Sequence, residues 1–370
     1  MQVRLDKRAR IIGEGGQAYP VDLLRDHTLK QIREKYTDEA GELTLEVGEE
    51  APDDVVTIGG RVMFLRNTGK LCFTSLQDGF TESSNGERLQ AMLSKALVGE
   101  QALAAWKSDV DLGDFVWVKG FVARSRRGEL SVMATEWKMA SKALRPLPTL
   151  HKELGEETRV RRRYADLVAR EEARQMVRVR AAITRAIRTT LDELGFLEIE
   201  TPILQLVHGG AAARPFNTHL NAFDIGMSLR IALELYLKRA MVGGMDRVYE
   251  MGRVFRNEGI DSNHSAEFTM LEAYMSWGNQ FTIAEVIQQI IVRAADALGG
   301  RQIQTEQGVI DLDGQWEWVH VHPELSRRLG REITLDTPVE ELRAIAAEHD
   351  VEIDPAWEAG KIVMELFGEI

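Results

Sequence analysis

The stretch from Arg253 to Tyr274, RVFRNEGIDSNHSAEFTMLEAY, carries a dense set of side chains that can do chemistry. It places arginine, glutamate, histidine and aromatic residues on and around one polar loop. A guanidinium group binds phosphate oxygens, and an aromatic ring can stack on a base. The stretch therefore predicts a nucleotide site.

The residues that flank this loop alternate with the two-residue period of β-strands. We expect two paired strands. Before the loop, one side of the strand carries Val248, Glu250, Gly252, Val254 and Arg256, and after the loop one face carries Phe268, Met270, Glu272 and Tyr274. The connection, residues 257–266, is longer than an ordinary hairpin turn. Long polar loops often carry ligand contacts, so we expect this loop to touch the ligand.

Composition limits the class of protein. The chain has 370 residues, 44% of them hydrophobic, which predicts two or more domains with real cores. The formal net charge of −12 argues against nonspecific coating of nucleic acid, although it allows local basic patches. Cys72 is the single cysteine and excludes an intrachain disulfide framework. No apolar run approaches the length of a membrane span. We expect a cytoplasmic location and no membrane partner.

Residues 55–148 contain short β-rich runs separated by glycines and charges, which predict a five-stranded barrel. The preceding residues 1–54 predict a helical extension in which Thr28 and Gln31 form a capping box. Small barrels of the OB type bind oligonucleotides through exposed aromatic rings and nearby cations, so Phe73 and Arg66 are candidates for such contacts. The alternative, that Phe73 is a core residue and Arg66 a solvated edge residue, stays open.

Residues 149–370 read as amphipathic helices alternating with antiparallel hairpins, which predicts an α+β fold. One helix is expected over 171–194, another starts near Glu234 and ends at Gly243, and a third opens with a capping box of Thr282 and Glu285. Motifs of phosphate loops, Rossmann folds, zinc sites and serine hydrolases are absent from the sequence.

Several long motifs occur in one order: RRRYADL, GFLEIETP, HGGAAARPFNTH, RIALELYLKR, GRVFRNEG and EFTMLEAY. With them the chain resembles the class II lysyl-tRNA synthetases over nearly all of its length, and GIDSNHSAEF resembles actinobacterial members. The resemblance implies an OB-fold anticodon-binding domain at 55–148. It also implies the N-terminal part of a class II catalytic domain at 149–370, an antiparallel sheet with flanking helices and the start of an inserted helical region.

The resemblance implies a reaction in which L-lysine and ATP form lysyl-adenylate, followed by transfer of lysine to tRNA(Lys). Arg256 would be the catalytic residue, bridging the lysine carboxylate and the α-phosphate of ATP. Glu258 would bind the adenine amino group, His264 would approach the terminal phosphates, and Phe268 would stack on adenine. Without the surrounding motif, the alternative interpretation is that Phe268 is a core residue of a strand and that Glu258 is a charged residue at the tip of the loop.

The lysine site implied by the resemblance uses Glu234 for the α-amino group, Glu272 and Tyr274 for the ε-ammonium group, and the backbone carbonyl of Gly210. Glu272 is informative because an unpaired carboxylate on a strand face is costly to bury, and a cationic ligand would relieve that cost. The alternative is an internal salt bridge to an arginine. Leu233 stands where many family members have proline.

In the barrel, the resemblance assigns Phe73 to stacking on the anticodon and Arg66, Gln90 and Glu129 to reading or anchoring its bases. The expected partners are the anticodon and acceptor end of tRNA(Lys), L-lysine, ATP and a second copy of the chain in a homodimer. Mg²⁺ is the expected cofactor.

The family's third motif, a glycine-rich strand and helix with another ATP-binding arginine, is not found in the sequence. We therefore expect a chain truncated before that motif, with impaired activity and with its magnesium ligands in the missing portion, so no metal ligand is assigned. Two alternatives remain open. One is a noncatalytic tRNA-binding paralogue, and the other is an aspartyl- or asparaginyl-type synthetase of the same subclass.

Overall fold

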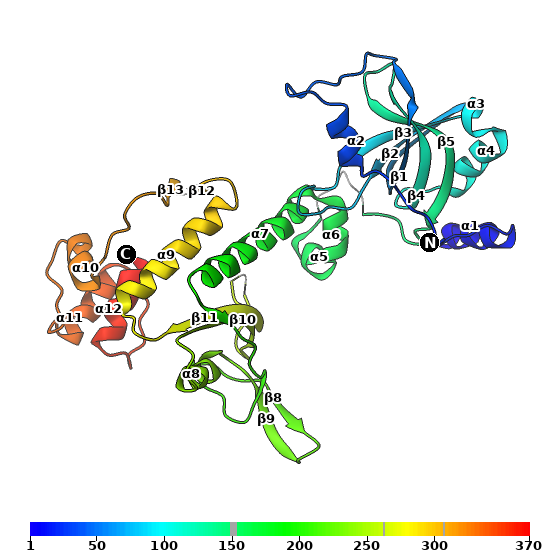
Figure 1. Cartoon of the computed structure of the whole chain (residues 1–370). Coiled ribbons are helices and arrows are strands. Elements are labelled where there is room, and N and C mark those ends of the chain that lie inside the picture. Colours follow the sequence, from blue (N-terminus) through cyan, green and yellow to red (C-terminus); the bar gives the residue numbers. More distant parts are fainter. Residues whose placement is uncertain (149–153, 262, 306–307) are drawn as a thin grey trace. The chain divides into compact units, whose positions relative to one another are not determined.

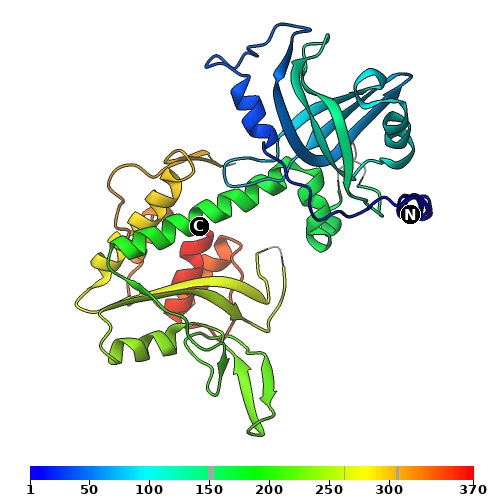
Figure 2. The same ribbon diagram turned by 45° about the vertical axis from the view of Figure 1, so that its right-hand side comes forward.

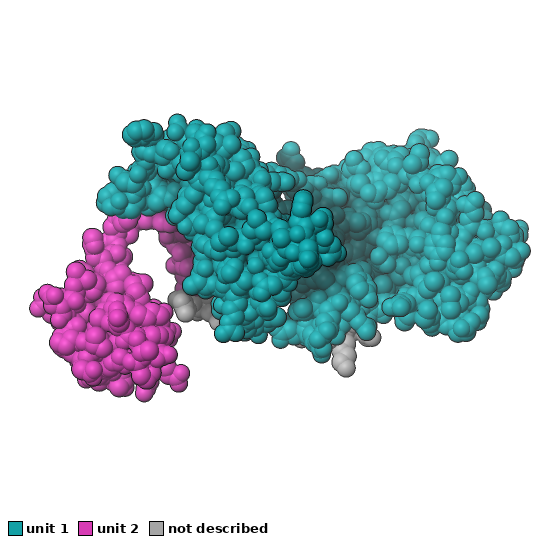
Figure 3. All heavy atoms as spheres, turned by 90° about the horizontal axis from the view of Figure 1, so that it is seen from below, with its two compact units in different colours: residues 1–298 teal, residues 299–370 magenta. Residues whose placement is uncertain are grey.

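A computed structural model describes residues 1–148, 154–261, 263–305 and 308–370. The chain divides into two compact units, residues 1–298 and residues 299–370, which Figure 3 shows in different colours. The predicted start of the second domain, at residue 149, lies outside the described residues.

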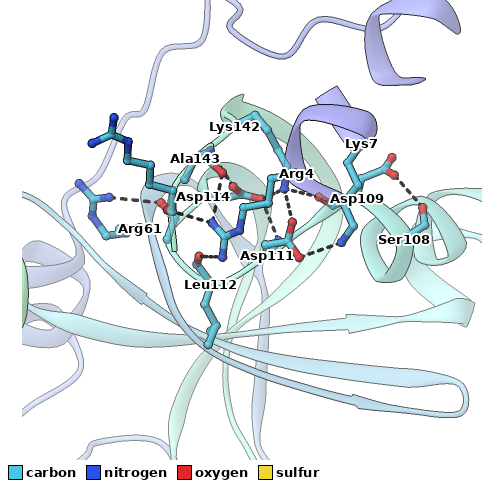
Figure 4. Close-up of polar contacts among 12 residues, drawn as sticks. Arg4, Lys7, Arg61, Ser108, Asp109, Asp111, Leu112, Asp114, Lys142 and Ala143 are labelled. Atoms are coloured by element: carbon cyan, nitrogen blue, oxygen red, sulfur yellow. Dashed lines mark hydrogen bonds and ion pairs between the residues drawn. The ribbon is translucent and has the colours of Figure 1, made fainter. Parts of the chain in front are cut away.

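Two helices, α1 (Gln2–Gly13) and α2 (Leu29–Lys35), precede the first long strand. Helix α2 begins as predicted, because the Thr28 hydroxyl accepts the Gln31 amide and the Gln31 side chain accepts the Thr28 amide. Helix α1 is fixed by its basic face (Figure 4). Arg4 donates to the carbonyl of Leu112 at 2.9 Å, and Lys7 pairs with Asp111 at 2.7 Å.

The predicted five-stranded barrel is confirmed (Figure 1). Its strands are β1 (Glu50–Thr68), β2 (Leu71–Gln77), β3 (Arg88–Ser94), β4 (Phe115–Arg124) and β5 (Leu130–Ser141). The closed order is β1-β2-β3-β5-β4, with β3 and β5 parallel and the other pairs antiparallel. Helices α3 (Lys95–Val98) and α4 (Glu100–Asp109) lie between β3 and β4 in the chain.

The barrel is filled by side chains from alternate positions of its strands. On β2, for example, Cys72 and Leu76 are buried in the core, whereas Phe73 lies outside that core cluster and is half-buried. Gly120 marks a close approach between two strands. A Cβ atom there would lie 2.0 Å from the Met133 carbonyl oxygen, beside a register shift between β4 and β5. Glycine is therefore required for β4 and β5 to pair at this point.

The rest of the first unit combines helices with two small sheets (Figure 2). The helices are α5 (Glu156–Arg161), α6 (Arg163–Ala169), α7 (Glu171–Glu193), α8 (Glu234–Val242) and α9 (Gln280–Asp296). The strands are β6 (Leu197–Glu198), β7 (Leu204–Gln205), β8 (Asn217–Leu220), β9 (Ile225–Leu229), β10 (Arg247–Phe255) and β11 (Glu267–Met275). The sheet orders are β11-β10-β6 and β7-β9-β8, and only β6 pairs in parallel.

Helices cover both faces of the β10–β11 pair. Tyr249 packs with residues of α7 and α9, including Leu191 and Val286. On the other face, Val248 and Val254 pack against the buried Leu237 of α8. Successive residues of a strand point to opposite faces, so even-numbered residues of β10 and β11 face the α8 side.

One predicted helix start is wrong. Asn279, not Thr282, is the N-cap of α9, and Thr282 occupies the third helical position. The Asn279 side chain accepts the amides of Phe281 and Thr282 at 3.0 and 3.1 Å, so it satisfies two free donors at the helix start. The chain turns at Ser276 and Trp277, so the helix starts soon after that turn, with Asn279 as its cap.

The second unit consists of β12 (Gln302–Thr305), β13 (Gly308–Asp311), α10 (Val321–Leu329), α11 (Val339–Glu348) and α12 (Ala359–Glu369). Its three helices share an apolar core that includes Leu325, Leu342, Ile345, Ile362 and Leu366. The mixed helices and antiparallel strands confirm the predicted α+β class. Within the described residues, no helix combines the length and the apolar character needed to cross a membrane.

Candidate functional site

The two strands predicted around the polar loop are paired antiparallel, as expected. Glu250 lies opposite Glu272, and Val254 lies opposite Phe268. Pairing continues past the end of β10, because the Arg256 amide donates to the Ala266 carbonyl at 2.9 Å. The predicted chemical residues of β10 and β11 therefore share the face that packs against α8.

Glu272 is held at the start of α8. Its carboxylate accepts the Leu233 amide at 2.9 Å and the Tyr274 hydroxyl at 2.8 Å. Burial raises the pKa of Tyr274, and the hydrogen bond to Glu272 raises it further, so the phenol stays protonated and can donate. Glu272 makes no ion pair with an arginine in the described part of the chain. The alternative expectation of an internal salt bridge is therefore wrong for this residue.

Arg256 lies beside the same segment. Its Nε donates to the Ile231 carbonyl at 3.4 Å, two residues before the amide that Glu272 accepts. The guanidinium carbon of Arg256 is 5.2 Å from the centre of the Phe268 ring, within range of a cation–π contact. Phe268 is half-buried, and so is Arg256. The structure thus brings the predicted phosphate-binding arginine and the predicted stacking ring together.

Gly210 and Glu234 are also brought together. Gly210 has a φ of +85°, and a Cβ atom there would lie 2.8 Å from the Glu234 Cβ, so only glycine fits this close approach. Glu234 opens α8 and pairs with Lys238 at 2.5 Å. The Lys238 ammonium lies 6.0 Å from the centre of the Tyr274 ring. Glu234 and Tyr274 therefore flank a position already occupied by an ammonium group of the protein itself.

Glu258 and His264 are exposed residues of the loop. The ring Nδ1 of His264 lies 2.8 Å from an Asp261 oxygen, and Asp261 also accepts the amides of Asn263 and His264 at 2.7 Å. The Asn263 amide and then the His264 ring hold the pKa of Asp261 below its usual range. Among the described residues, neither Glu258 nor His264 has a recorded contact with Arg256 or Phe268.

A buried ion pair on this face was missed by the sequence reasoning. Arg230 and Glu250 have side chains only 3% and 4% exposed, and their closest atoms are 2.6 Å apart. The Thr201 hydroxyl donates to the other Glu250 oxygen at 2.5 Å. A Cβ atom at position 252 would lie 2.3 Å from the guanidinium of Arg230. The glycine in GRVFRNEG is the available signal, because it leaves room for a neighbouring side chain to cross the strand.

The four predicted RNA-reading residues of the barrel line one cavity of about 850 Å³. Arg66 on β1 lies directly opposite Phe73 on β2. Gln90 on β3 donates to the Ser131 hydroxyl at 2.8 Å, and that hydroxyl donates to the Glu129 carbonyl at 3.0 Å. Because Phe73 faces this cavity, the interpretation of Phe73 as a core residue does not describe the structure.

The same cavity has residues that the sequence did not single out. Phe64 is 54% exposed and lies two positions before Arg66 on β1, and Arg126 and Arg127 come from the turn between β4 and β5. Phe64 pairs with Ser75, two positions after Phe73, so the two rings are diagonal neighbours on adjacent strands. The alternation of β1 was the signal that put Phe64 on the same face as Arg66.

Comparison with known proteins agrees with this arrangement. Residues 155–357 match a family model described as tRNA synthetases class II (D, K and N), and residues 56–140 match one described as OB-fold nucleic acid binding domain. The chain is 53% identical over 370 residues to a Lysine–tRNA ligase of Kineococcus radiotolerans, covering 99% of this chain and 72% of that protein. The chain belongs to the class II lysine–tRNA ligase family.

Two further relatives match nearly the whole of this chain. A Lysine–tRNA ligase 1 of Mycobacterium tuberculosis is 51% identical over 374 residues, covering 99% of this chain and 72% of that protein. The Lysylphosphatidylglycerol biosynthesis bifunctional protein LysX of Rhodococcus jostii is 39% identical over 374 residues, again covering 99% of this chain but 32% of that protein.

Proposed function

We propose that this chain activates L-lysine with ATP and transfers the lysine to tRNA(Lys). One structural observation supports this proposal in addition to family membership. Glu272 and Tyr274, a carboxylate and a neutral phenol suited to an ammonium group, lie on the same sheet face as Arg256 and Phe268, a pair suited to a nucleotide. A site for lysine and a site for ATP would therefore adjoin.

In the first step, a lysine carboxylate oxygen attacks the α-phosphorus of ATP, and the bond from that phosphorus to the pyrophosphate oxygen breaks. The proposed role of Arg256 is to hold the carboxylate and the α-phosphate in line and to stabilise the charge that develops on the phosphate oxygens. A guanidinium group suits this task because it stays protonated and offers several donors in one plane. Phe268 would stack on the adenine ring.

The proposed lysine site uses Glu272 and Tyr274 for the ε-ammonium group and Glu234 with the Gly210 carbonyl for the α-amino group. Two carboxylates on one face match the two cations of lysine. Because Lys238 pairs with Glu234 at 2.5 Å, the incoming α-amino group would take over a carboxylate that an ammonium group already neutralises. Glu258 and His264 are proposed to reach the adenine and the terminal phosphates from the loop.

Synthetases of this class use ATP and typically Mg²⁺. Across the described residues, no group of three or more His, Cys, Asp or Glu side chains is arranged to hold a metal ion. We therefore assign no magnesium ligand and derive no step through the ion.

In the second step, a ribose hydroxyl at the tRNA acceptor end attacks the carbonyl carbon of the adenylate. The bond from that carbon to the phosphate oxygen breaks, AMP leaves, and its phosphate takes up the hydroxyl proton. We propose that the barrel holds the anticodon in the 850 Å³ cavity, with Phe73 stacking on one base and Arg66, Gln90 and Glu129 reading or anchoring its neighbours. Phe64 would offer a second ring for the next base, and Arg126 and Arg127 would meet phosphates.

A homodimer and a cytoplasmic location complete the proposal. Large apolar side chains are exposed on α7 and on the segment after it, which supports a subunit contact: Met176, Val177, Leu197, Leu206 and Val207. The proposed domain limits are 1–54 for the helical extension, 55–148 for the barrel and 149–370 for the catalytic part and the start of its insertion.

The test is amino-acid-dependent ATP–pyrophosphate exchange by the 370-residue chain, with lysine, aspartate and asparagine compared side by side. We expect exchange with lysine alone, and the absolute rate also tests the expectation of impaired activity. Exchange with aspartate or asparagine would instead assign the chain to another specificity of the subclass. Binding of tRNA(Lys) with no exchange for any of the three would indicate a noncatalytic paralogue.

A further inference from the structure

The segment Arg230–Leu233 touches two charged residues of the proposed active site, Arg256 and Glu272. Its Ile231 carbonyl accepts Arg256 Nε at 3.4 Å, and its Leu233 amide donates to Glu272 at 2.9 Å. These two contacts come from opposite strands of the β10–β11 pair. A shift of this short segment would therefore move two groups together: the carbonyl that Arg256 contacts and the amide that Glu272 accepts.

Arg230 is the residue that fixes this segment. Its guanidinium donates to the carbonyls of Arg253 at 2.7 Å and Thr201 at 3.0 Å and pairs with Glu250 at 2.6 Å. Its backbone is held as well, because its amide donates to the Ile203 carbonyl and its carbonyl accepts the Phe255 amide, each at 2.9 Å. These partners come from two other segments, residues 201–203 and residues 250–255.

We propose that Arg230, through its buried pair with Glu250, is a positioning residue that sets Arg256 and Glu272 in one geometry before the substrates bind. It touches neither lysine nor ATP in this proposal. A planar guanidinium directs donors from several nitrogens toward separate acceptors, whereas an ammonium group donates from a single nitrogen and cannot reach the same three positions around Arg230. The expected changes in kcat and KM rest on the proposed function, whereas the expected loosening of the segment Arg230–Leu233 does not.

Gly252 provides an independent way to disturb the same contact. A Cβ atom at this position would lie 2.3 Å from Arg230 Nη2 and 3.0 Å from Glu250 Oε1, so Gly252→Ala displaces the guanidinium without removing a charge. Gly226 in β9 is a matched control, because a Cβ atom there has no neighbour within 4 Å. Arg253→Lys is the control for Arg230→Lys, since the Arg253 side chain is 54% exposed.

The kinetic test compares Arg230→Lys and Gly252→Ala with the wild-type chain in lysine-dependent exchange, well below each variant's unfolding temperature. Misplacement of reacting groups by about 1 Å costs about 100-fold. We expect kcat to fall about 10- to 100-fold and the lysine KM to rise, with the affinity for tRNA(Lys) unchanged. Gly226→Ala and Arg253→Lys should match the wild type. A lower melting temperature with unchanged kcat and KM would overturn the proposal.

A second measurement does not depend on activity. Amide hydrogen exchange of Leu233 and Phe255 reports the two backbone contacts of the segment, whereas the Tyr249 amide reports the centre of the sheet. In Arg230→Lys the first two amides should exchange faster and the third should not change. Unchanged amide hydrogen exchange at Leu233 and Phe255 would overturn the positioning role of Arg230, whether or not the wild-type chain activates lysine. Failure of the wild-type chain to activate lysine would contradict the proposed function and leave this measurement valid.

Discussion

Two buried ion pairs, one in the barrel and one in the catalytic sheet, differ in what their partners do. Lys142 has no exposed side-chain surface and donates to Asp114 and Asp111 at 2.6 Å and to the Asp109 carbonyl at 2.7 Å (Figure 4). All three partners belong to one short stretch that runs from Asp109, the last residue of α4, to Asp114, just before β4. None of them lines the 850 Å³ cavity. Lys142 therefore holds one connection of the barrel in place and does not line the cavity that is proposed to bind RNA.

Arg230 is also buried, but its partners Glu250, Arg253 and Phe255 lie on β10, which leads into Arg256 and pairs with the strand of Glu272. Glu250 lies opposite Glu272, and the Arg230 carbonyl binds the strand end that leads into Arg256. The difference teaches that burial alone does not assign a role to a charge. Removal of either buried cation should cost stability, because it leaves a buried carboxylate unpaired. Only Arg230 is proposed to affect function, since the segment that it fixes contacts Arg256 and Glu272.

The largest expected effect is on the stability of the barrel. Lys142→Met would leave Asp114 buried without its cation, and removing one partner of a buried pair costs about 3–5 kcal/mol. We expect chemical denaturation to show this loss in the barrel transition, while lysine-dependent exchange by the folded protein stays at the wild-type rate. Lys138→Met, at an exposed pair with Glu136, is the control and should cost at most about 1 kcal/mol. A lower rate of lysine-dependent exchange in folded Lys142→Met would contradict the distinction between Lys142 and Arg230.

Arg256→Ala should have the largest effect on catalysis. Loss of one donor to a developing oxyanion lowers kcat about 100- to 1,000-fold. The reduction should be seen in lysyl-adenylate formation, and tRNA(Lys) affinity should be unchanged because the barrel is intact. Arg253→Ala, three residues earlier and exposed, should retain nearly all activity. Equal defects in the two variants would mean that the effect comes from net charge and not from the position of Arg256.

Leu233→Pro tests the contact at the start of α8. Proline has no amide hydrogen, so this substitution removes the donor to Glu272 while the first turn of a helix tolerates the ring. A hydrogen bond to a charged group contributes about 1.5–3 kcal/mol, which predicts at least a tenfold loss in kcat/KM for lysine. The ATP KM should not change. Leu233→Ala keeps the amide, so a similar loss in that variant would assign the effect to packing.

The smallest expected effect is on the RNA-binding face. Stacking of one base on an aromatic ring contributes about 1–3 kcal/mol, so Phe73→Ala should weaken tRNA(Lys) binding by that amount. Lysine-dependent exchange and the melting temperature should stay at wild-type values, since Phe73 lies outside the barrel core. Phe223→Ala, an exposed ring in the β8–β9 turn, is the control. Loss of lysine-dependent exchange in Phe73→Ala would show that the barrel cavity and the β10–β11 face do not act independently.

Much of this arrangement could be predicted from local patterns. Period-two alternation placed Glu250 with Val254 on one face of β10 and Glu272 with Phe268 on one face of β11, and the capping pair of Thr28 and Gln31 marked the start of α2. The barrel residues Arg66 and Phe73 meet because directly opposite positions on paired strands share a face. These features depend on residues close in sequence or on regular pairing.

The remaining features depend on contacts between distant segments. Arg230 precedes Glu250 by twenty residues and has no periodic signal, so its pairing could not be read from the sequence. The cap of α9 was misassigned because Asn279 and Thr282 both suit an N-cap, and the chain path into the helix decides between them. The positions of Glu258 and His264 depend on a long loop whose side chains are exposed.

The most direct test of lysine activation on this face is the selectivity of Glu272→Gln. Exchange is measured with L-lysine and with L-norleucine, which lacks the ε-ammonium group, for the wild-type chain and the variant. We predict that kcat/KM for lysine falls at least about tenfold in the variant, that the preference for lysine over norleucine narrows, and that the ATP KM is unchanged. A variant that keeps the wild-type preference for lysine would contradict the account.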